Sequence, residues 1–201
     1  PYQKEINFEL DFKKKKPTCV FRGNATGCGI TTKTNMRLQA AQLSYDWNKH
    51  KDKKDLLDAK LVGWNRKPKI CDGEFNEINP KDFKFKAKKS NFMNLEDQSS
   101  YKYILNIDGH VKAFRLGNEL RMGSVVLLVD SPYTLWFSKF LEPMKHFVPI
   151  KSDLSNLESQ IRWCRDHDDD CEIIAEHAIE FYNTYLDKDG AYNYFQKTLM
   201  D

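Results

Sequence analysis

A continuous apolar run, SVVLLV at residues 124–129, is the feature that most constrains how this chain can fold. The run is short, rich in β-branched residues, and lacks the alternation of apolar and polar residues that marks a half-exposed strand. Strands that are buried on both faces, as in parallel sheets, have this composition. We therefore expect 124–129 to be a strand of a parallel sheet.

The segments around this run alternate between strand and helix patterns. The other strands of the C-terminal half are predicted at 101–107 and 146–150. Helices are predicted at 112–122, at 133–141, from Leu154, and again from Asp168. Such alternation is typical of α/β domains, so the predicted fold is a Rossmann-like parallel sheet with flanking helices and right-handed crossovers.

The N-terminal half repeats this pattern less clearly. A short strand is predicted at 18–21, a helix from about Thr32 to Trp47, and another strand at 58–64. Residues 65–100 are rich in Lys, Asn, Asp and Pro. We interpret them as a long connection that contains short elements.

Composition and charge exclude several classes of protein. The 32 basic and 29 acidic residues give a net charge of only +3, which is too balanced to indicate nucleic-acid binding. The lysine run at 13–16 precedes Pro17 and is interpreted as a solvated linker. No segment approaches the roughly 20 apolar residues of a membrane helix. The five cysteines include no CxxC pair, which argues against zinc; reduced thiols are expected, with one disulfide in a secretory lumen as the alternative.

Three predicted strand ends carry residues suited to ligand binding, and ligands of open parallel sheets bind at such ends. The first is FRGNATGCG at 21–29, where glycines allow close approach of an anion and the next helix offers free N–H groups. Arg22 adds positive charge. The loop matches neither the P-loop nor the GxGxxG pattern, and an ordinary strand-to-helix turn is the alternative.

The second strand end is Asp108-Gly109, followed by Arg115. Arg115 is expected in the second turn of the next helix, where its guanidinium can hold two phosphate oxygens. Asp108 can accept a hydrogen bond from a sugar hydroxyl. A surface Asp–Arg pair is the alternative.

The third region combines 129–137 with 146–157. Ser131, Trp136, His146 and Asp153 are all expected near strand ends. Core packing is the alternative for Trp136, and a helix cap is the alternative for Asp153.

Taken in order, these motifs resemble one family. The segments VFRGNATG, YKYILNIDGHVKAFRL, GSVVLLVDSPYTLWF, MKHFVPIKSDLSNL and IAEHAIEFY are similar to glycosyltransferase family 90, which includes fungal capsule-associated xylosyltransferases and animal protein O-glucosyltransferases. The resemblance covers about residues 19–186. It implies two facing Rossmann-like domains of the GT-B type, of which this chain resembles the donor-binding half; a shortened form of the enzyme is the alternative.

The resemblance also implies a reaction. A sugar, glucose or xylose, passes from a UDP-sugar to a hydroxyl of a protein or glycan acceptor, with inversion and with neither metal nor cofactor. It places Arg22, Gly23 and Thr26 near the diphosphate together with Arg115, and Ser131 and Trp136 beside the nucleoside. The complete set of predicted substrate-binding residues is Arg22, Gly23, Asn24, Thr26, Asp108, Gly109, Arg115, Ser131, Trp136, His146 and Asp153.

Some positions depart from the family pattern. Leu135 stands where relatives commonly carry Glu, and Met144 replaces a frequent Trp. Relatives place the catalytic carboxylate upstream of FRG, so no general base is assigned, and Asp108 is the single in-chain candidate. We expect 1–17 to be a linker or a remnant of an acceptor domain, 18–186 the nucleotide-sugar domain, and 187–201 a tail helix.

Two other functions stay open. The chain could be a non-catalytic module that binds a sugar nucleotide or a partner and has lost the base. It could also be another Rossmann-type enzyme, such as a methyltransferase, although no acidic residue closes a GxGxG-type turn. The resemblance suggests the secretory lumen, whereas a viral or microbial protein of this kind is expected in the cytoplasm.

The sequence DHDDD at 166–170 is a competing motif. Its Asp-x-Asp pattern holds metal-bound nucleotide diphosphates in some sugar transferases. Here it lies between two predicted helices, and acidic residues stabilise a helix N-terminus. We therefore interpret it as a helix start, not as a metal site. Ser155 and Glu158 similarly have the spacing of a capping box.

Overall fold

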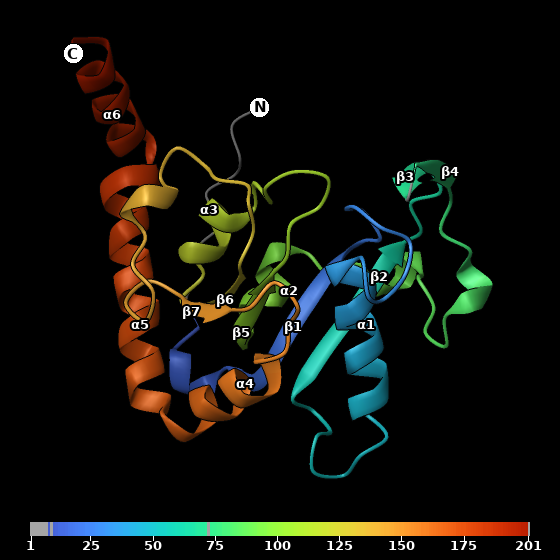
Figure 1. The fold of residues 1–201 in the computed structure, drawn as a ribbon. Helices are drawn as coiled ribbons and strands as arrows, with labels where there is room; N and C mark the ends of the chain where they lie inside the picture. Colours follow the sequence, from blue (N-terminus) through green and yellow to red (C-terminus); the bar gives the residue numbers. More distant parts are fainter. Residues whose placement is uncertain (1–7, 9, 72, 201) are drawn as a thin grey trace.

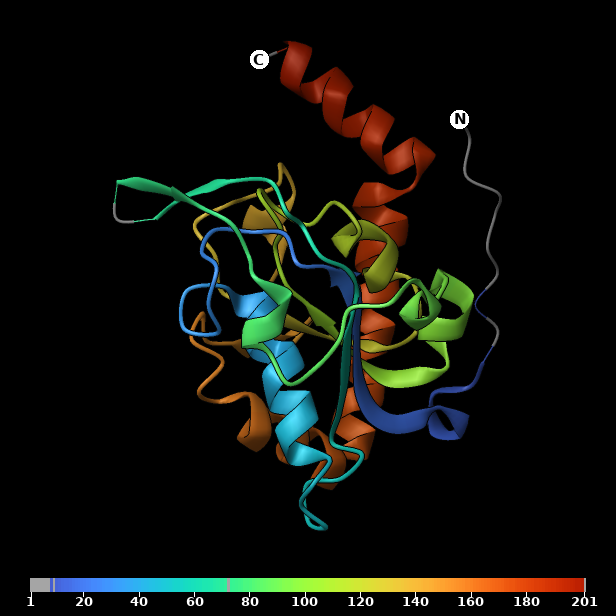
Figure 2. The same cartoon turned by 90° about the vertical axis from the view of Figure 1, so that its right-hand side faces the viewer.

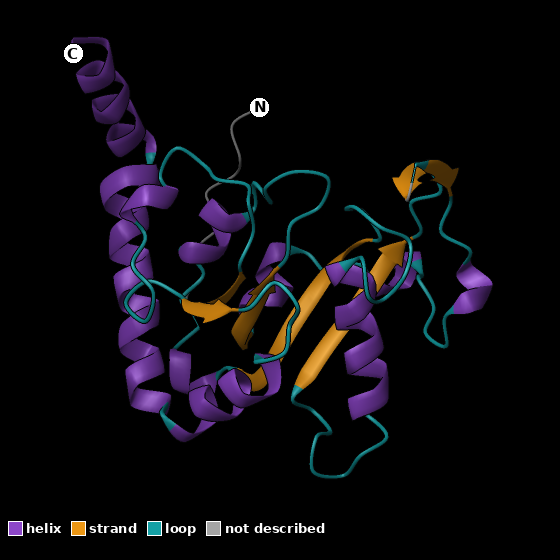
Figure 3. Cartoon of the chain, viewed as in Figure 1, coloured by secondary structure: helices purple, strands orange, loops and turns teal. Residues whose placement is uncertain are grey.

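The computed structural model describes residues 8, 10–71 and 73–200; residues 1–7 and 9, part of the predicted N-terminal linker, lie outside the described residues. Five strands form a central sheet in the order β2-β1-β5-β6-β7, and every neighbouring pair is parallel. Figure 3 shows these strands between the helices. They are β1 (Lys16–Asn24), β2 (Leu57–Gly63), β5 (Tyr101–Asn106), β6 (Val125–Val129) and β7 (Val148–Ile150). The predicted Rossmann-like α/β fold is confirmed.

The helices lie around this sheet (Figure 1). The α-helices are α1 (Met36–Trp47), α2 (Leu95–Ser99), α3 (Leu116–Leu120), α4 (Leu157–Asp166), α5 (Asp168–Phe181) and α6 (Lys188–Met200). The single-turn elements are η1 (Phe12–Lys14), η2 (Pro80–Asp82), η3 (Lys89–Asn91), η4 (Ser138–Phe140) and the π-helical turn η5 (Tyr182–Leu186). The helix break predicted at 166–168 is confirmed, since α4 ends at Asp166 and α5 begins at Asp168.

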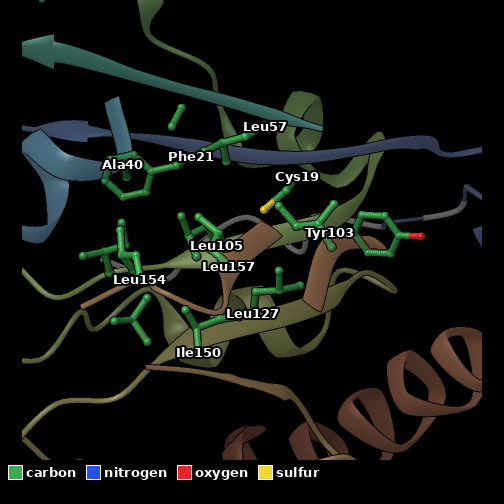
Figure 4. Packing of buried hydrophobic residues seen from close by; sticks show 14 of the residues in the cluster. Cys19, Phe21, Ala40, Leu57, Tyr103, Leu105, Leu127, Ile150, Leu154 and Leu157 are labelled. Atoms are coloured by element: carbon green, nitrogen blue, oxygen red, sulfur yellow. The ribbon is translucent and has the colours of Figure 1, made fainter. Parts of the chain in front are cut away.

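Alternate residues of the strands are buried on opposite faces of the sheet. Phe21, Leu105 and Leu127 belong to a core under α1 and α4, part of which is shown in Figure 4. On the other face, Val126 packs with α3 and the end of α5. Fully burying such side chains stabilises the fold by about 1.5–3 kcal/mol each. The inner strands are therefore buried on both faces, as the apolar run at 124–129 predicts.

Two predicted helices differ from the structure. The helix predicted at 133–141 is wrong, because this segment is a loop that contains only the turn η4. Its hydroxyl groups compete with a helix: Ser131 Oγ accepts from the Tyr133 N–H at 3.1 Å, and Ser138 Oγ accepts from the Leu135 N–H at 2.9 Å. The helix predicted at 112–122 is limited to Leu116–Leu120.

Residues 65–100 form the predicted long connection with short elements. Strands β3 (Lys69–Cys71) and β4 (Glu74–Asn76) make an antiparallel hairpin that projects beyond β2 (Figures 1 and 2). The chain then returns through η2 and η3 to α2. Trp64 stacks with Phe83 and Phe85 at centroid distances of 5.4 and 5.9 Å, which fixes the returning segment against the domain.

The strand order reverses between β1 and β5. Chain connections lead from β1 toward β2 on one side and from β5 toward β6 on the other. In open parallel sheets the loops on the two sides of such a reversal diverge at the carboxyl ends of the strands and leave a crevice. The fold therefore predicts a ligand crevice between the loops that follow Asn24 and Asn106.

Two further predictions concern the membrane and the thiols. Among the described helices, none has the length and apolar character needed to cross a bilayer. Cys19, Cys164 and Cys171 are free and buried, and Cys28 is free and exposed. Reduced thiols stay a prediction.

Candidate active site

The loop after β1 is a compact turn held on the N-terminus of α1. Gly27 and Gly29 have φ angles of 108° and 80°, which side-chain-bearing residues rarely adopt. Asn35 caps α1 by accepting from the Arg37 and Leu38 N–H groups. Its amide donates to the carbonyl oxygens of Thr26 and Gly29, each at 3.2 Å. The loop and the helix N-terminus therefore form one unit.

The loop after β5 closes on the first loop at Gly109. A Cβ at this position would lie 2.9 Å from Thr26 Oγ1 and 3.2 Å from Arg37 Nη2, so the two loops meet because residue 109 has no side chain. Asp108 is buried, and its Oδ1 accepts from the Ala113 N–H at 2.8 Å. Its Oδ2 lies 3.4 Å from Lys112 Nζ.

Arg37 joins the two loops and was not predicted from the sequence. Its guanidinium is buried and donates to four oxygens: Asp108 O at 2.8 Å, Ile107 O at 2.9 Å, Asn24 O at 3.1 Å and Thr26 Oγ1 at 2.7 Å. Burial, together with the nearby Arg115 charge, lowers the pKa of Arg37 to about 10. The sequence does hold one signal for this role. A cation in the first turn of a helix opposes the helix dipole, so it needs a partner elsewhere.

A crevice of about 180 Å³ lies between the two loops. Thr26, Gly27, Asp108, Gly109 and Ser131 are among its lining residues. We call it the switch-point crevice. A neighbouring cavity of about 320 Å³ runs along the ends of β6 and β7 and shares Ser131 and Tyr133 with the crevice. The two spaces are therefore neighbours, and Thr26, Asp108 and Ser131 supply polar atoms to the crevice.

The structure brings four predicted site residues to this crevice and places four others in a second cavity. Thr26, Asp108, Gly109 and Ser131 line the switch-point crevice. The second cavity, of about 480 Å³, lies between the end of β1 and the segment 92–98. The predicted residues that line it are Arg22, Gly23, Asn24 and Arg115.

Arg22 forms an ion pair with Asp58 of strand β2. Its Nη2 lies 2.6 Å from Asp58 Oδ2, and its Nη1 also donates to the Asp58 carbonyl oxygen. Burial acts to raise the pKa of Asp58, but the hydrogen bonds from Arg22 and Lys60 outweigh it and lower that pKa. Arg22 therefore fastens β1 to β2.

Arg115 stands at the N-cap of α3, not in its second turn as predicted. Its Nε lies 2.8 Å from the buried Glu119 carboxylate, and its Nη1 donates to the Arg22 carbonyl oxygen at 2.7 Å. Its Nη2 has no hydrogen-bond partner among the described residues. Burial raises the pKa of Glu119, while Arg115 acts in the opposite direction.

The guanidinium groups of Arg37 and Arg115 meet at the end of β1. Both lie over the Phe21 ring, at 5.6 and 5.0 Å from its centroid. A Cβ at residue 23 would lie 3.2 Å from Arg37 Nη1 and 3.6 Å from Arg115 Nη1, so Gly23 leaves the room in which both arginines approach the strand. Two positive groups therefore converge at the carboxyl edge of the sheet, between the switch-point crevice and the second cavity.

The remaining predicted residues lie outside the lining of these cavities. Trp136 packs against Tyr194 of α6, with ring centroids 4.3 Å apart. His146 is buried against Phe181; its Nδ1 accepts from the Glu142 N–H at 3.0 Å, and burial lowers its pKa. Asp153 is exposed, and its hydrogen bonds from Ser155 lower its pKa.

The acidic cluster at 166–170 has the helix-start position expected for it. Asp168 forms ion pairs with Lys102 at 2.5 Å and with Lys13 at 3.2 Å. Within the described residues, no group of three or more His, Cys, Asp or Glu side chains is arranged to hold a metal ion.

Comparison with known proteins gives a consistent picture. Residues 3–201 match the family model described as "Glycosyl transferase family 90". Uncharacterized protein 179R of Invertebrate iridescent virus 6 is 41% identical over 212 residues, covering 99% of this chain and 18% of that protein. Human protein O-glucosyltransferase 3 is 33% identical over 168 residues, covering 81% of this chain and 28% of that protein. Protein O-glucosyltransferase 2 of Danio rerio is 41% identical over 101 residues, covering half of this chain and 20% of that protein. The chain thus matches only 18–28% of the length of these relatives.

Proposed function

Because the chain belongs to glycosyl transferase family 90, we propose that its carboxyl edge is the donor site of a glycosyltransferase. The donor is a UDP-sugar, and the acceptor is a hydroxyl group of a protein or glycan. The transfer inverts the anomeric centre and needs no metal.

One observation carries this proposal. The switch-point crevice lies at the reversal of strand order, between two loops closed by Gly109, and continues into the cavity beside β7. Nucleotides bind at this position in open parallel sheets, with the phosphates near helix N-termini and glycine loops. We place the diphosphate in the crevice by Thr26, beside the N-terminus of α1, and the nucleoside in the larger cavity by Tyr133.

The chemistry of the transfer depends on the leaving group. Breaking the bond between the sugar and UDP places negative charge on the diphosphate, and preorganised positive groups stabilise that charge as it develops. Arg115 lines the neighbouring second cavity, and its Nη2, which is buried and without a hydrogen-bond partner among the described residues, is the donor that we assign to a charge-assisted hydrogen bond with the diphosphate. Arg37 acts through its field and by fixing both loops, because its donors already serve protein oxygens.

Glucose and xylose are the proposed donor sugars. The relatives named protein O-glucosyltransferase support glucose. Xylose lacks the hydroxymethyl group of glucose, so the fit of this group in the sugar site decides between the two donors. The two sugars are therefore compared directly in the experiment below.

A non-catalytic role is the second candidate, and the state of Asp108 favours it. A general base must have a lone pair within hydrogen-bond reach of the acceptor hydroxyl. The Asp108 side chain is buried; its Oδ1 accepts from the Ala113 N–H, and its Oδ2, which has no hydrogen-bond partner among the described residues, lies 3.4 Å from the buried Lys112 Nζ. An ion pair within the protein therefore holds this carboxylate. In this case the chain binds the sugar nucleotide and another part of the enzyme supplies the base, or transfer does not occur.

Calorimetric titration and thermal shift with UDP, UDP-glucose, UDP-xylose, GDP-mannose and S-adenosylmethionine test the donor site. We expect the UDP compounds to bind and raise the melting temperature, because a ligand of the native state stabilises it. Gly109→Ala should weaken UDP binding about tenfold, or about 1.4 kcal/mol, by forcing the loops apart. Asp168→Ala, at the start of α5, is the control and should leave UDP affinity unchanged.

The outcomes separate the candidates. Sugar transfer from a UDP-sugar to an acceptor identifies the enzyme, whereas UDP binding with no turnover identifies the binding module. A response to S-adenosylmethionine alone would refute both.

A further inference from the structure

Lys112 is a charged residue of the carboxyl edge to which the donor site described above gives no role. It lies in the segment between β5 and α3 and is only 8% exposed. It lines the cavity of about 320 Å³ at the ends of β6 and β7, where we place the nucleoside. A lysine is seldom buried to this degree unless its ammonium group has a partner. The contacts of this ammonium group therefore indicate its function.

Within the described residues, the ammonium group of Lys112 makes one polar contact, the ion pair with Asp108. Its Nζ lies 3.4 Å from Asp108 Oδ2, and this oxygen is fully enclosed and has no hydrogen-bond partner in the described part of the chain. The pair is thus a contact between charges without a hydrogen bond. An ammonium group has three N–H donors, and none of them is used by the described residues. All three are available to a ligand.

The ion pair lies where two cavities meet. Asp108 lines the switch-point crevice and Lys112 lines the neighbouring cavity, and the two spaces share Ser131 and Tyr133. A nucleotide with its diphosphate in the crevice and its nucleoside in the cavity has its α-phosphate at this junction, because the α-phosphate is the group joined to the ribose. Lys112 therefore lies beside the position that we assign to this phosphate.

The charges around the junction call for a cation at this position. A diphosphate in the crevice meets the buried Asp108 carboxylate, and two negative groups repel each other strongly away from water. Lys112 is the one cation among the described residues that line either space. The other charged residue of the larger cavity, Asp130, is exposed, and its Oδ1 accepts from the Ser131 N–H at 2.9 Å. An ammonium group between the carboxylate and the phosphate attracts both.

We propose, resting on the donor site proposed above, that Lys112 binds the α-phosphate of the donor nucleotide. One N–H of its ammonium group donates a charge-assisted hydrogen bond to a phosphate oxygen. Asp108, on the other side, holds the ammonium group at the junction of the two cavities. Lys112 thereby distinguishes a nucleotide from a nucleoside, and it acts together with Arg115, which we assign to the diphosphate from the second cavity.

Binding of uridine, UMP and UDP to the full chain and to Lys112→Met tests this role. Calorimetric titration measures UMP and UDP, and ligand-detected NMR measures the weaker binding of uridine. We expect Lys112→Met to weaken UMP and UDP about tenfold each, because a hydrogen bond to a charged group is lost. Uridine affinity should stay at the parental value, because Met keeps the apolar stem that lines the cavity.

The control is Lys151→Met. Lys151 is exposed and directly follows β7 at the same edge of the sheet, but it lines neither cavity. UDP affinity of this variant should stay at the parental value.

Asp108→Asn in the Lys112→Met background tests the role of charge. Lys112→Met leaves the Asp108 carboxylate without its cation beside the phosphate. Asn retains an oxygen that can accept from the Ala113 N–H and removes the negative charge. UDP affinity should therefore recover about fivefold relative to Lys112→Met alone. A further loss of UDP affinity in the double variant would contradict the proposed arrangement of charges.

The remaining outcomes separate this inference from the donor site itself. Equal weakening of uridine and UDP by Lys112→Met would overturn the inference, because it would show a change of cavity shape. UDP affinity that Lys112→Met leaves unchanged would also overturn it, while the donor site would stand. Weakening of UDP without weakening of UMP would refute the assignment to the α-phosphate. If the parental chain binds neither UMP nor UDP, the donor site is refuted, and this inference with it.

Discussion

Arg37 and Arg115 give the carboxyl edge of the sheet its character at the scale of single residues. Arg37 donates its hydrogen bonds to oxygens of the protein, whereas the buried Nη2 of Arg115 has no partner within the described part of the chain. Their charges repel, which contributes to the lowered pKa of Arg37, and the buried Glu119 beside Arg115 offsets part of this repulsion. An anion bound at this edge would relieve the rest.

Replacing Arg115 tests whether it contacts the donor. Arg115→Ala should weaken UDP binding by about 1.5–3 kcal/mol, the range for a hydrogen bond to a charged group. Calorimetric titration measures the change. Arg121→Ala, on the same helix segment, is the control and should change UDP affinity little. If affinity is unchanged in Arg115→Ala, this arginine serves only the second cavity and the buried Glu119.

Sequence reasoning located the strand ends at residue scale but not the partners of each side chain. Asp108, Gly109 and Thr26 were predictable because the carboxyl ends of parallel strands share one edge. The ion pair of Arg22 with Asp58 was not, because it follows from the register of β1 on β2 across 36 residues. The role of Arg37 likewise depends on carbonyl oxygens from two distant loops.

At the scale of elements, Asn35 connects the glycine loop to α1. Its side chain caps the helix and also holds Thr26 and Gly29. Asn35→Ala should therefore lower the free energy of unfolding by about 0.5–2 kcal/mol, the usual effect of losing a cap. Denaturant unfolding measures this loss. UDP affinity should fall as well, because the loop loses its support.

The control for this cap is Asn76→Ala, on the projecting hairpin. Its amide makes only a long hydrogen bond of 3.5 Å to Glu74 O, so the substitution should change stability little. Equal effects of the two substitutions, or an Asn35→Ala variant with parental stability, would contradict the capping role.

Predictions of helices and strands succeeded where a local pattern of apolar residues determined the structure of the segment. The apolar runs became strands, and the helix predicted from Leu154 is α4, which begins at Leu157 and buries Leu157, Ile161 and Cys164. The aromatic segment 133–141 failed because its rings pack on distant helices: Phe140 stacks on Tyr185 at 5.2 Å. Such contacts are invisible in a local pattern.

The capping box predicted from Ser155 and Glu158 is also wrong. The N-cap of α4 is Asn156, and no side-chain capping bond forms there. Glu158 instead pairs with Lys53 at 2.6 Å and with Arg162 at 3.0 Å. Ion pairs with neighbouring segments have replaced the local capping interaction.

At the scale of the whole molecule, the two edges of the sheet differ in how their polar groups are used. At the edge where the strands begin, Lys15 connects the segments that precede β5 and β6. Its buried Nζ donates to Ser99 O and Met122 O at 2.7 Å and to Ser124 Oγ at 3.1 Å. No acidic side chain among the described residues pairs with it, and burial lowers its pKa to about 8.

This buried lysine predicts a dependence of stability on pH. The pKa of an unfolded lysine is about 10.4, so between about pH 8 and 10.4 the unfolded chain binds more protons than the folded chain. Stability should therefore rise with pH in this window, by about 1 kcal/mol per pH unit from this group. Below about pH 7 the cost of burying the charged lysine is fully present, and this group adds no further dependence on pH. Chemical unfolding at pH 7, 8, 9 and 10 measures the slope.

Lys15→Met should flatten this part of the stability profile, whatever its effect at pH 7. Lys14→Met, at an exposed neighbouring position, should keep the parental slope. A slope that is the same in all three proteins would show that Lys15 keeps its charge through this range.

The Arg37 bridge has a kinetic consequence. It fixes the loops after β1 and β5 against each other with groups of the protein alone, so capture of a ligand requires no prior rearrangement there. The observed rate of association should then increase linearly with ligand concentration and reach no plateau. Differences between good and poor donors will consequently lie in how long each remains bound.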